Sequence, residues 1–245
     1  MSTLIQITIP VLNEAVTISS QIQKIHNYIA DEWFDSLQIE LVIADNGSTD
    51  QTPELARALE ANLEMVRYVR VDQRGVGAAL KAAWLNSDAE LVGYMDLDLA
   101  TDLDYLKPAI DKILTGSADI VSGSRLAEGA SVFGRKALRT YTSICFNQIV
   151  KLLFNTSFTD GMCGFKFLRR KILPNLIGAG ATSDGWIFAT EILITGEYLK
   201  YRVVDLPVSW TDSPDSKVKI MKLAIEYIRA LLKLKAKLRE GGYSL

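Results

Sequence analysis

The chain has 245 residues, of which 49% are hydrophobic and 23% are charged, and its formal net charge is −2. This length and apolar content indicate one α/β domain or two small ones, and they exclude a disordered protein. Two cysteines (Cys145, Cys163) and one histidine (His26) exclude a disulfide framework, a histidine-based zinc site and a Ser-His-Asp triad.

The same composition bounds the location of the protein. No apolar run approaches the roughly 18 residues of a membrane span, and the first ten residues, MSTLIQITIP, do not resemble a signal peptide. We therefore expect a cytoplasmic protein, either soluble or peripheral on the inner face of the membrane.

The first half of the chain alternates β-rich runs with helical patterns. Expected strands are residues 4–10, 39–45, 65–71, 90–96 and 118–124; expected helices end near Trp33 or begin near Thr52, Gly75 and Asp104. This alternation predicts an α/β fold with a doubly wound, mostly parallel sheet and helices on both faces. The ligand site of such a sheet lies beyond the carboxyl ends of its strands.

Polar residues follow four of these strands and are expected to meet at that edge: Asn13 and Glu14, then Asp45, then Arg74 to Gly77, then Asp96 and Asp98. Asp96 and Asp98 stand at i and i+2 and can point to the same side of an extended strand. At about 4 Å and an effective dielectric of about 20 their repulsion is on the order of 4 kcal/mol, which a divalent cation would turn into attraction. The alternative is that they only cap the next helix.

Two glycine-containing loops extend the expected site. NGSTD (46–50) combines a turn with a helix start and can hold a ribose or a base edge. RGVGAAL (74–80) opens a helix with small residues that permit close approach of a nucleotide, although small residues at a helix start more commonly serve packing.

The second half is less regular. A helical pattern runs from about Arg135 to Phe154, and a strand is expected over residues 201–210. Without a linker or a repeat, one domain is the simplest reading. We assign residues 1–216 to it, with a C-terminal helix at 217–245.

That C-terminal helix is basic and amphipathic. Residues 217–239 contain eight basic residues and one acidic residue, a net of +7, so the rest of the chain carries −9. Such a helix can lie in a membrane interface. The alternative is that its apolar arc packs on the domain or on a second copy of the chain in a homo-oligomer.

The motifs together resemble one family. IPVLNE (9–14), DNGSTD (45–50), RGVGAAL, MDLDLATD (95–102), SGSR (122–125), DGMCGFKF (160–167), the Trp186 and Glu191 pair, and LPVSWTDSPDSKV (206–218) occur in the order found in inverting nucleotide-sugar glycosyltransferases of the GT-A fold. The resemblance is strongest to the polyprenyl-phosphate (dolichyl-phosphate) glucose and mannose synthases, and it spans Ile9 to Lys217.

The resemblance implies a role for each matching position. Pro10, Asn13, Glu14, Gly75, Gly77 and Ala78 would lie at the nucleotide, Asp45 would read the base, Asp96 would face ribose and metal, and Asp98 would bind Mg²⁺ or Mn²⁺. Arg125, Arg139 and Ser143 would hold the acceptor phosphate, and Lys217 would reach the diphosphate.

Some positions depart from the family pattern: Leu12, Asn46, Val76, Met162 and Ala189. They weaken the expectations for acceptor contacts and fine specificity. Ala100, Thr101 and Asp102 after Asp98 resemble the glucose branch, so UDP-glucose is favoured over GDP-mannose.

The expected chemistry depends on the acceptor. A phosphomonoester is already anionic near neutral pH, so it needs cations to position it and no general base. A hydroxyl acceptor needs a carboxylate base, for which Asp160 is the candidate. Each of these residues also has a purely structural interpretation. Arg139 could be a solvated helix residue, Asp160 a turn residue and Trp186 a core residue. A nucleotide-sugar binding module without catalysis is the remaining alternative.

Overall fold

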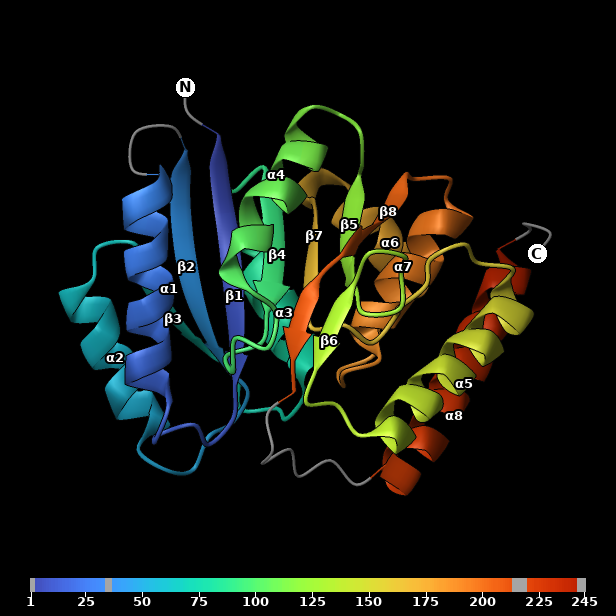
Figure 1. Ribbon diagram of the computed structural model, residues 1–245, viewed down its shortest axis with the longest axis horizontal. Helices are drawn as coiled ribbons and strands as arrows, with labels where there is room; N and C mark the ends of the chain where they lie inside the picture. Colours follow the sequence, from blue (N-terminus) through green and yellow to red (C-terminus); the bar gives the residue numbers. More distant parts are fainter. Residues whose placement is uncertain (1–2, 34–36, 213–219, 242–245) are drawn as a thin grey trace.

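The computed structural model describes residues 3–33, 37–212 and 220–241. Within them a seven-stranded sheet has the order β3-β2-β1-β4-β7-β5-β8, and β6 and β9 form a separate two-stranded sheet (Figure 1). All pairs in the large sheet are parallel except those of β7 with β4 and β5. The mostly parallel α/β sheet predicted from the sequence is confirmed.

The elements follow one another closely along the chain. The strands are β1 (Leu4–Val11), β2 (Gln38–Asp45), β3 (Val66–Arg70), β4 (Leu91–Met95), β5 (Ile120–Ser124), β6 (Ser131–Phe133), β7 (Phe165–Arg169), β8 (Val203–Pro207) and β9 (Ser209–Thr211); the helices are α1 (Ile18–Trp33), α2 (Thr52–Asn62), α3 (Val76–Leu85), α4 (Leu106–Leu114), α5 (Ala137–Phe154), α6 (Leu173–Ala179), α7 (Phe188–Tyr198) and α8 (Ile220–Glu240).

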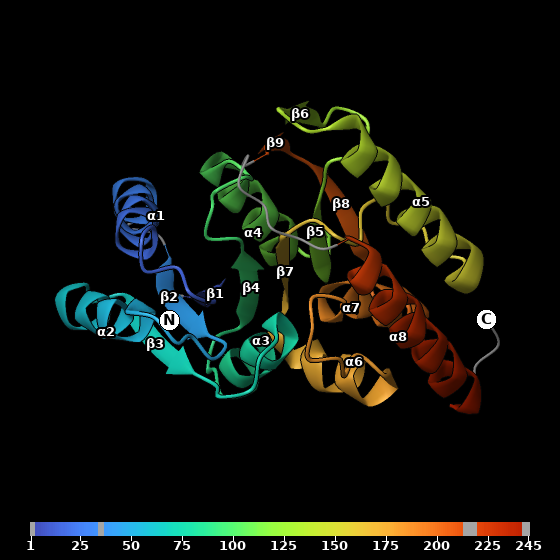
Figure 2. The ribbon, with the colours of Figure 1, turned by 90° about the horizontal axis from the view of Figure 1, so that it is seen from below.

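Two apolar clusters cover the two faces of the large sheet. On one face α1, α2 and α4 pack against alternate strand residues such as Ile5, Ile7 and Ile9. On the other face the cluster is built from α3, α6, α7 and α8 (Figure 2). Because both faces are covered, the central strands are nearly continuous apolar runs, which is why they could be recognised in the sequence.

The strand β7 was not expected. It runs antiparallel between β4 and β5, with Phe165 and Phe167 in one apolar cluster and Leu168 in the other. Lys166 stands between the two phenylalanines. Lysine is depleted in β-strands and is rarely buried, so it is uncommon at the centre of a strand. That lysine conceals the strand pattern in the sequence.

The strand expected over residues 201–210 is two strands. Val208 joins them: its N–H donates to Ser124 O on β5, and its carbonyl accepts from Ser131 N on β6. The chain thus changes sheets at Val208, so β8 pairs with β5 while β9 pairs with β6.

The helices α5 and α8 lie side by side at one end of the molecule (Figures 1 and 2), and Phe146 packs on Tyr227 with ring centroids 5.6 Å apart. On α8, Tyr227, Leu231, Leu234 and Leu238 are buried in the apolar core. Part of the apolar arc of this helix therefore packs on the domain. Among the described residues, no helix combines the length and hydropathy needed to cross a bilayer.

Candidate functional site

The loops after β1 and β2 are tied to each other at the carboxyl edge of the sheet. The backbone N–H of Asn13 donates to Ser48 Oγ at 2.9 Å, and Asn13 Oδ1 accepts from Thr49 N at 2.8 Å. The backbone N–H of Glu14 donates to Thr52 Oγ1 at 2.8 Å. The expected convergence of these two loops is therefore present, while Pro10 lies just below them as a buried residue of β1.

Asp45 is fully buried and fully engaged. Its Oδ1 accepts from Ser48 N at 2.8 Å, and its Oδ2 accepts from the Tyr68 hydroxyl at 2.8 Å and from Arg70 Nη1 at 3.1 Å. In this conformation Asp45 organises the 46–50 loop, and contact with a base requires one of these partners to move.

The glycines of the RGVG segment serve packing in this structure. A Cβ at Gly75 would lie 2.1 Å from Asp184 O, and a Cβ at Gly77 would lie 2.4 Å from Ser183 O. The backbone N–H of Ala78 donates to Asp184 O at 3.1 Å. The 183–185 loop thus occupies the N-terminus of α3, where a nucleotide contact was expected.

Asp96 and Asp98 directly follow β4, and neither forms an ion pair with a described residue. Asp96 Oδ1 is inaccessible to solvent and accepts no hydrogen bond from any described residue. Asp98 is exposed, and its Oδ1 accepts from Ala100 N at 3.1 Å. Burial, reinforced by the charge of Asp98, raises the pKa of Asp96 from its ordinary value of 3.8 to about 7.

The 160–164 turn forms the wall beside Asp96. The backbone N–H of Asp96 donates to Gly164 O at 3.0 Å, and a Cβ at Gly164 would lie 1.8 Å from Asp96 Oδ2. Only glycine at this position leaves room for the Asp96 carboxylate.

The raised pKa of Asp96 predicts a pH-dependent stability of the metal-free protein. The folded protein holds this proton up to about pH 7 while the unfolded chain releases it near 3.8, so the free energy of unfolding falls as the pH rises between these values. The difference between the folded and unfolded pKa values of Asp96 corresponds to a change in the free energy of unfolding on the order of 4 kcal/mol. We expect urea unfolding in EDTA to give a smaller free energy at pH 8 than at pH 5, and Asp96→Asn to flatten this slope; equal slopes in both proteins would contradict the prediction.

A buried ion pair lies across the sheet from the carboxylates. Arg125, directly after β5, donates from Nε to Asp160 Oδ2 at 2.7 Å and from Nη2 to Asp160 Oδ1 at 3.0 Å. The guanidinium stacks on the Trp210 ring, 4.7 Å from its centroid. Arg125 and its hydrogen bonds hold the pKa of Asp160 below its usual range despite burial, which makes this carboxylate a weak base.

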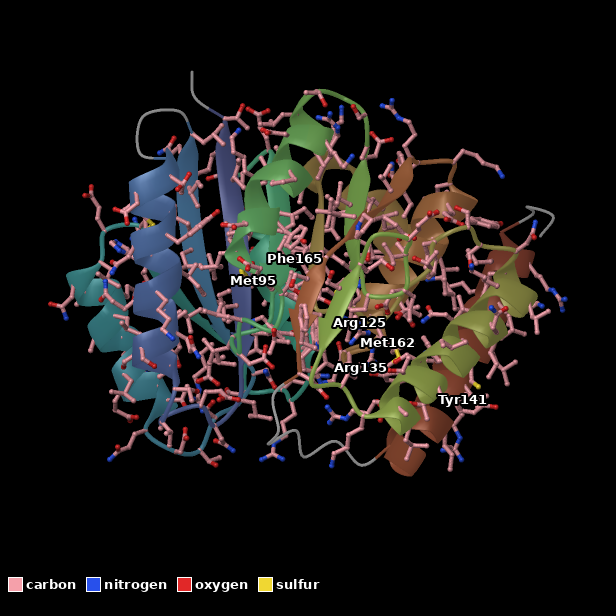
Figure 3. The ribbon with its side chains drawn as sticks, in the orientation of Figure 1. Met95, Arg125, Arg135, Tyr141, Met162 and Phe165 are labelled. Carbon is pink, nitrogen blue, oxygen red and sulfur yellow. The ribbon has the colours of Figure 1, made fainter. Side chains whose placement is uncertain are left out.

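Two more arginines surround the start of α5. Arg139 Nη1 donates to both carboxylate oxygens of Asp212 at 2.8 and 2.9 Å. Ser143 is buried, and its hydroxyl accepts from Arg135 Nη2 at 2.6 Å. We call Arg125, Arg135, Arg139 and Ser143 the arginine cluster; Figure 3 shows Arg125 and Arg135 at the same end of the sheet. The solvated-helix reading of Arg139 is excluded by its ion pair.

Lys166 lies beneath both groups. Its side chain is fully buried, its Nζ donates to Cys163 O at 2.6 Å, and burial lowers its pKa. The charges of Asp96 and Asp160 act on it in the opposite sense. Lys166 thus supports the 160–164 turn that separates Asp96 from the arginine cluster.

The sequence prediction missed Arg135, Lys166 and Asp212. Two features of the sequence could have indicated Arg135 and Lys166. Arg135 stands eight residues before Ser143, close to two turns of helix, and Lys166 interrupts an aromatic run. Lys217 lies outside the described residues. Trp186 is exposed and is not a core residue, whereas Glu191 is buried and accepts from Ser183 N at 2.9 Å and Ser183 Oγ at 2.6 Å.

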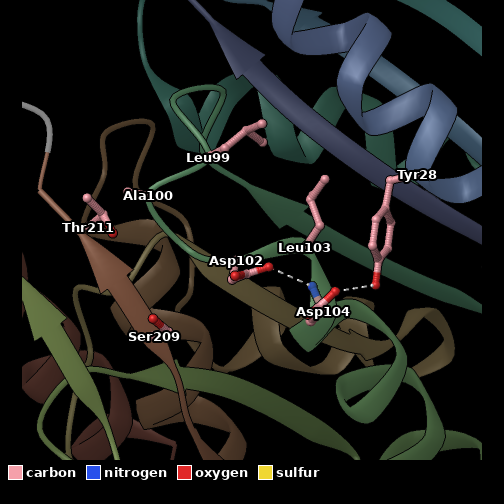
Figure 4. A pocket seen from close by; sticks show the side chains of 8 residues that line it. All are labelled: Tyr28, Leu99, Ala100, Asp102, Leu103, Asp104, Ser209 and Thr211. Atoms are coloured by element: carbon pink, nitrogen blue, oxygen red, sulfur yellow. Dashed lines mark hydrogen bonds between the residues drawn. The ribbon is translucent and has the colours of Figure 1, made fainter.

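A cavity of about 340 Å³ lies next to the loop after Asp98 but contains neither carboxylate of the pair (Figure 4). In it Tyr28 donates to Asp104 Oδ1 at 3.0 Å, and Asp102 accepts from Asp104 N at 3.1 Å. These contacts fix the loop 99–104 that carries the chain away from Asp98. Among the described residues, no group of three or more His, Cys, Asp or Glu side chains could hold a metal, so a cation here needs oxygen ligands beyond Asp96 and Asp98.

The fold and its charged edge define an α/β protein of the GT-A class. The chain resembles glucosyl-3-phosphoglycerate synthase from Mycobacterium tuberculosis in complex with Mn²⁺, UDP and glucosyl-3-phosphoglycerate, with a TM-score of 0.69 at 17% identity over 96% of this chain and 80% of that chain. It also resembles the mannosyltransferase PcManGT from Pyrobaculum calidifontis in complex with GDP-Man and Mn²⁺, with a TM-score of 0.62 at 20% identity over 98% of this chain and 65% of that one.

The chain belongs to glycosyl transferase family 2, whose model matches residues 6–177. It is 29% identical over 219 residues to glycosyltransferase AglD of Haloferax volcanii, covering 89% of this chain and 35% of AglD. It is 29% identical over 247 residues to the dolichyl-phosphate beta-glucosyltransferase of Saccharomyces cerevisiae, covering 92% of this chain and 71% of the yeast protein. The chain thus spans about a third of AglD and most of the yeast enzyme. It is a glycosyltransferase, as the motifs predicted.

Proposed function

We propose that this glycosyltransferase moves glucose from a nucleotide-diphosphate sugar to a polyprenyl phosphate, with inversion at the sugar carbon and with the help of Mg²⁺ or Mn²⁺. The observation that carries the proposal is the division of the edge into an acidic pair, Asp96 and Asp98, and an arginine cluster on the other side of the 160–164 turn. The yeast relative, whose name states glucose transfer to dolichyl phosphate, supports the choice of sugar and acceptor.

The acidic pair fits a divalent cation. Asp96 Oδ1 is buried and has no hydrogen-bond partner among the described residues, and the exposed Asp98 lies two residues further on, in the turn after β4. The remaining ligands would come from diphosphate oxygens and water, as is usual for Mg²⁺. When bound, the cation would neutralise the charge that develops on the leaving diphosphate. Asn13, Glu14 and Asp45 would flank the nucleotide, and Lys217 would contact the diphosphate.

The arginine cluster fits a phosphate acceptor. Arg125, Arg139 and Ser143 would position the phosphomonoester so that its oxygen attacks the sugar from the face opposite the leaving group. A phosphate oxygen needs no general base, which agrees with the lowered pKa of Asp160. In this role Asp160 holds Arg125 in place and does not take a proton.

A transfer assay tests the proposal. We expect radiolabelled UDP-glucose, more than GDP-mannose, to label undecaprenyl or dolichyl phosphate in the presence of Mn²⁺ or Mg²⁺, and EDTA to abolish the product. An α-linked donor should give a β-linked lipid. Transfer only to soluble or protein-bound hydroxyl acceptors, or nucleotide binding without any transfer, would contradict it.

We also propose that the protein works at an anionic membrane surface, where a polyprenyl phosphate is found. Exposed apolar side chains lie on both adjacent helices at one end of the molecule: Leu138, Tyr141, Ile144, Ile149 and Leu152 on α5, and Ile225, Ile228 and Leu232 on α8. Basic residues of α8 such as Arg229 and Lys233 flank them. This combination is typical of an interfacial helix pair.

Vesicle sedimentation checks the membrane proposal. We expect the protein to sediment with vesicles containing phosphatidylglycerol, and Leu232→Glu to lower the bound fraction about tenfold or more, because burying one such side chain contributes about 1.5–3 kcal/mol. The control is Leu85→Glu, which alters an exposed leucine at the end of α3. Equal binding of both variants, or self-association in place of vesicle binding, would overturn the proposal.

A further inference from the structure

We propose that Arg135, a residue to which the sequence motifs assign no role, is the arginine that binds the acceptor phosphomonoester directly. The inference rests on the proposed function and changes the expected division of labour within the arginine cluster. The geometry points to Arg125 and Arg139 as residues that shape the site, and to Arg135 as the one whose Nη1 has no acceptor among the described residues.

The guanidinium groups of Arg125 and Arg139 are already committed to carboxylates. Arg125 makes two hydrogen bonds to Asp160, stacks on Trp210, and has a side chain that is only 8% exposed. Arg139 contacts both oxygens of Asp212. A ligand would have to compete with these ion pairs for the same donors.

Arg135 differs from both. Its Nη2 donates to Ser143 Oγ at 2.6 Å and to the Arg139 carbonyl at 3.4 Å, but its Nη1 is buried with no hydrogen-bond partner among the described residues. No described carboxylate forms an ion pair with it. Arg125 and Arg139 each pair with a carboxylate, whereas Arg135 pairs with none among the described residues.

A buried N–H group without an acceptor is costly, and an anion with several oxygens would satisfy it. An arginine can present two donors to a phosphate in one plane, while the neighbouring Ser143 hydroxyl offers a further contact. Burial and the nearby charge of Arg125 lower the pKa of Arg135, which is the expected sign for a desolvated cation lacking its counter-ion.

The surroundings favour a lipid phosphate over a free one. Arg135 lies between β6 and α5, where Phe133, Leu138 and Tyr141 are exposed; Figure 3 labels Arg135 near the start of α5 and Tyr141 on that helix. A phosphate held at Arg135 would place an attached prenyl chain near these side chains.

The test compares Arg135→Gln, Arg135→Lys and the control Arg67→Gln, which changes a surface arginine on β3 that pairs with Glu40 at 3.7 Å. We expect Arg135→Gln to raise the KM for undecaprenyl phosphate about 10- to 100-fold, with the KM for the nucleotide sugar within about twofold of wild type. Arg135→Lys retains the charge but loses the planar pair of donors. Its KM for undecaprenyl phosphate should therefore lie between that of wild type and that of Arg135→Gln. Arg67→Gln should behave as wild type.

Ligand-induced thermal shifts keep this inference separate from the proposed function. Farnesyl phosphate, inorganic phosphate and farnesol are the probes. Stabilisation of wild type but not Arg135→Gln by farnesyl phosphate supports the inference; the same pattern with inorganic phosphate alone supports Arg135 as a phosphate ligand while contradicting a lipid acceptor. An unchanged shift or an unchanged acceptor KM in Arg135→Gln, or no shift of wild type with either phosphate, would overturn it.

Discussion

Asp98→Asn is expected to lower kcat by at least about 10³-fold while leaving the fold intact. The substitution removes one of the two negative charges that would hold the cation at the leaving diphosphate, and losing such transition-state stabilisation costs about 10²- to 10³-fold for a single neutral donor and more for a metal ligand. The side chain is exposed, and an asparagine Oδ1 can still accept from Ala100 N. Transfer of radiolabelled glucose to the lipid at saturating Mn²⁺ measures the effect.

The control for this variant is Asp111→Asn on α4. Asp111 is also a surface aspartate, and it pairs with Lys107 one turn away at 3.0 Å. Its removal should change the free energy of unfolding by less than about 0.5 kcal/mol and leave kcat unaltered. If Asp98→Asn retained kcat within tenfold of wild type, the proposed metal role of this residue would be wrong.

Asp160→Asn is expected to destabilise the protein by about 3–5 kcal/mol. The change leaves the Arg125 guanidinium buried beside a neutral amide, and an uncompensated buried charge carries a cost of this size. Chemical denaturation at pH 7 measures it. The matched control, Asp119→Asn, weakens partly exposed pairs with Arg169 and Arg202 at 3.6 Å and should cost about 1 kcal/mol or less.

The activity of Asp160→Asn distinguishes the two acceptor chemistries. If Asp160 positions Arg125, the folded variant retains turnover with a raised KM for the polyprenyl phosphate. If it were the general base for a hydroxyl, kcat would vanish at every pH and the acceptor KM would be unaffected. Replacing both partners, Asp160→Leu with Arg125→Met, should restore part of the lost stability because the buried guanidinium is removed together with its carboxylate.

The N-terminal half of the fold was predictable because its signals are local. β1, β2 and β4 are largely apolar runs, Asp45 ends β2, Asp96 directly follows β4, and α2 begins at Thr52 as expected. Parallel topology follows from the alternation of strands and helices. The position of Asp96 and Asp98 at the end of β4 could therefore be derived from a count of residues.

The arrangement of the arginine cluster was not predictable, because it depends on contacts between residues that are distant in the sequence. Nothing near Arg125 in the sequence indicates that it pairs with Asp160, 35 residues away, or that Arg139 pairs with Asp212, 73 residues away. The glycines of the RGVG segment could not be assigned for the same reason, since the 183–185 loop that packs on them is more than 100 residues distant. The sequence shows that these side chains are charged or small. Their contact partners are determined by the tertiary fold and could not be predicted from the sequence.

The insertion of β7 sets the width of the reaction site. Neighbouring strands are about 4.8 Å apart, so the ends of β4 and β5 are separated by two such steps, roughly 10 Å. If β4 and β5 were adjacent, about 5 Å would divide the acidic pair from the first arginine, too little for a hexose ring between two anionic groups. In the proposed reaction, this one reversed strand would act as a spacer with room for a single sugar.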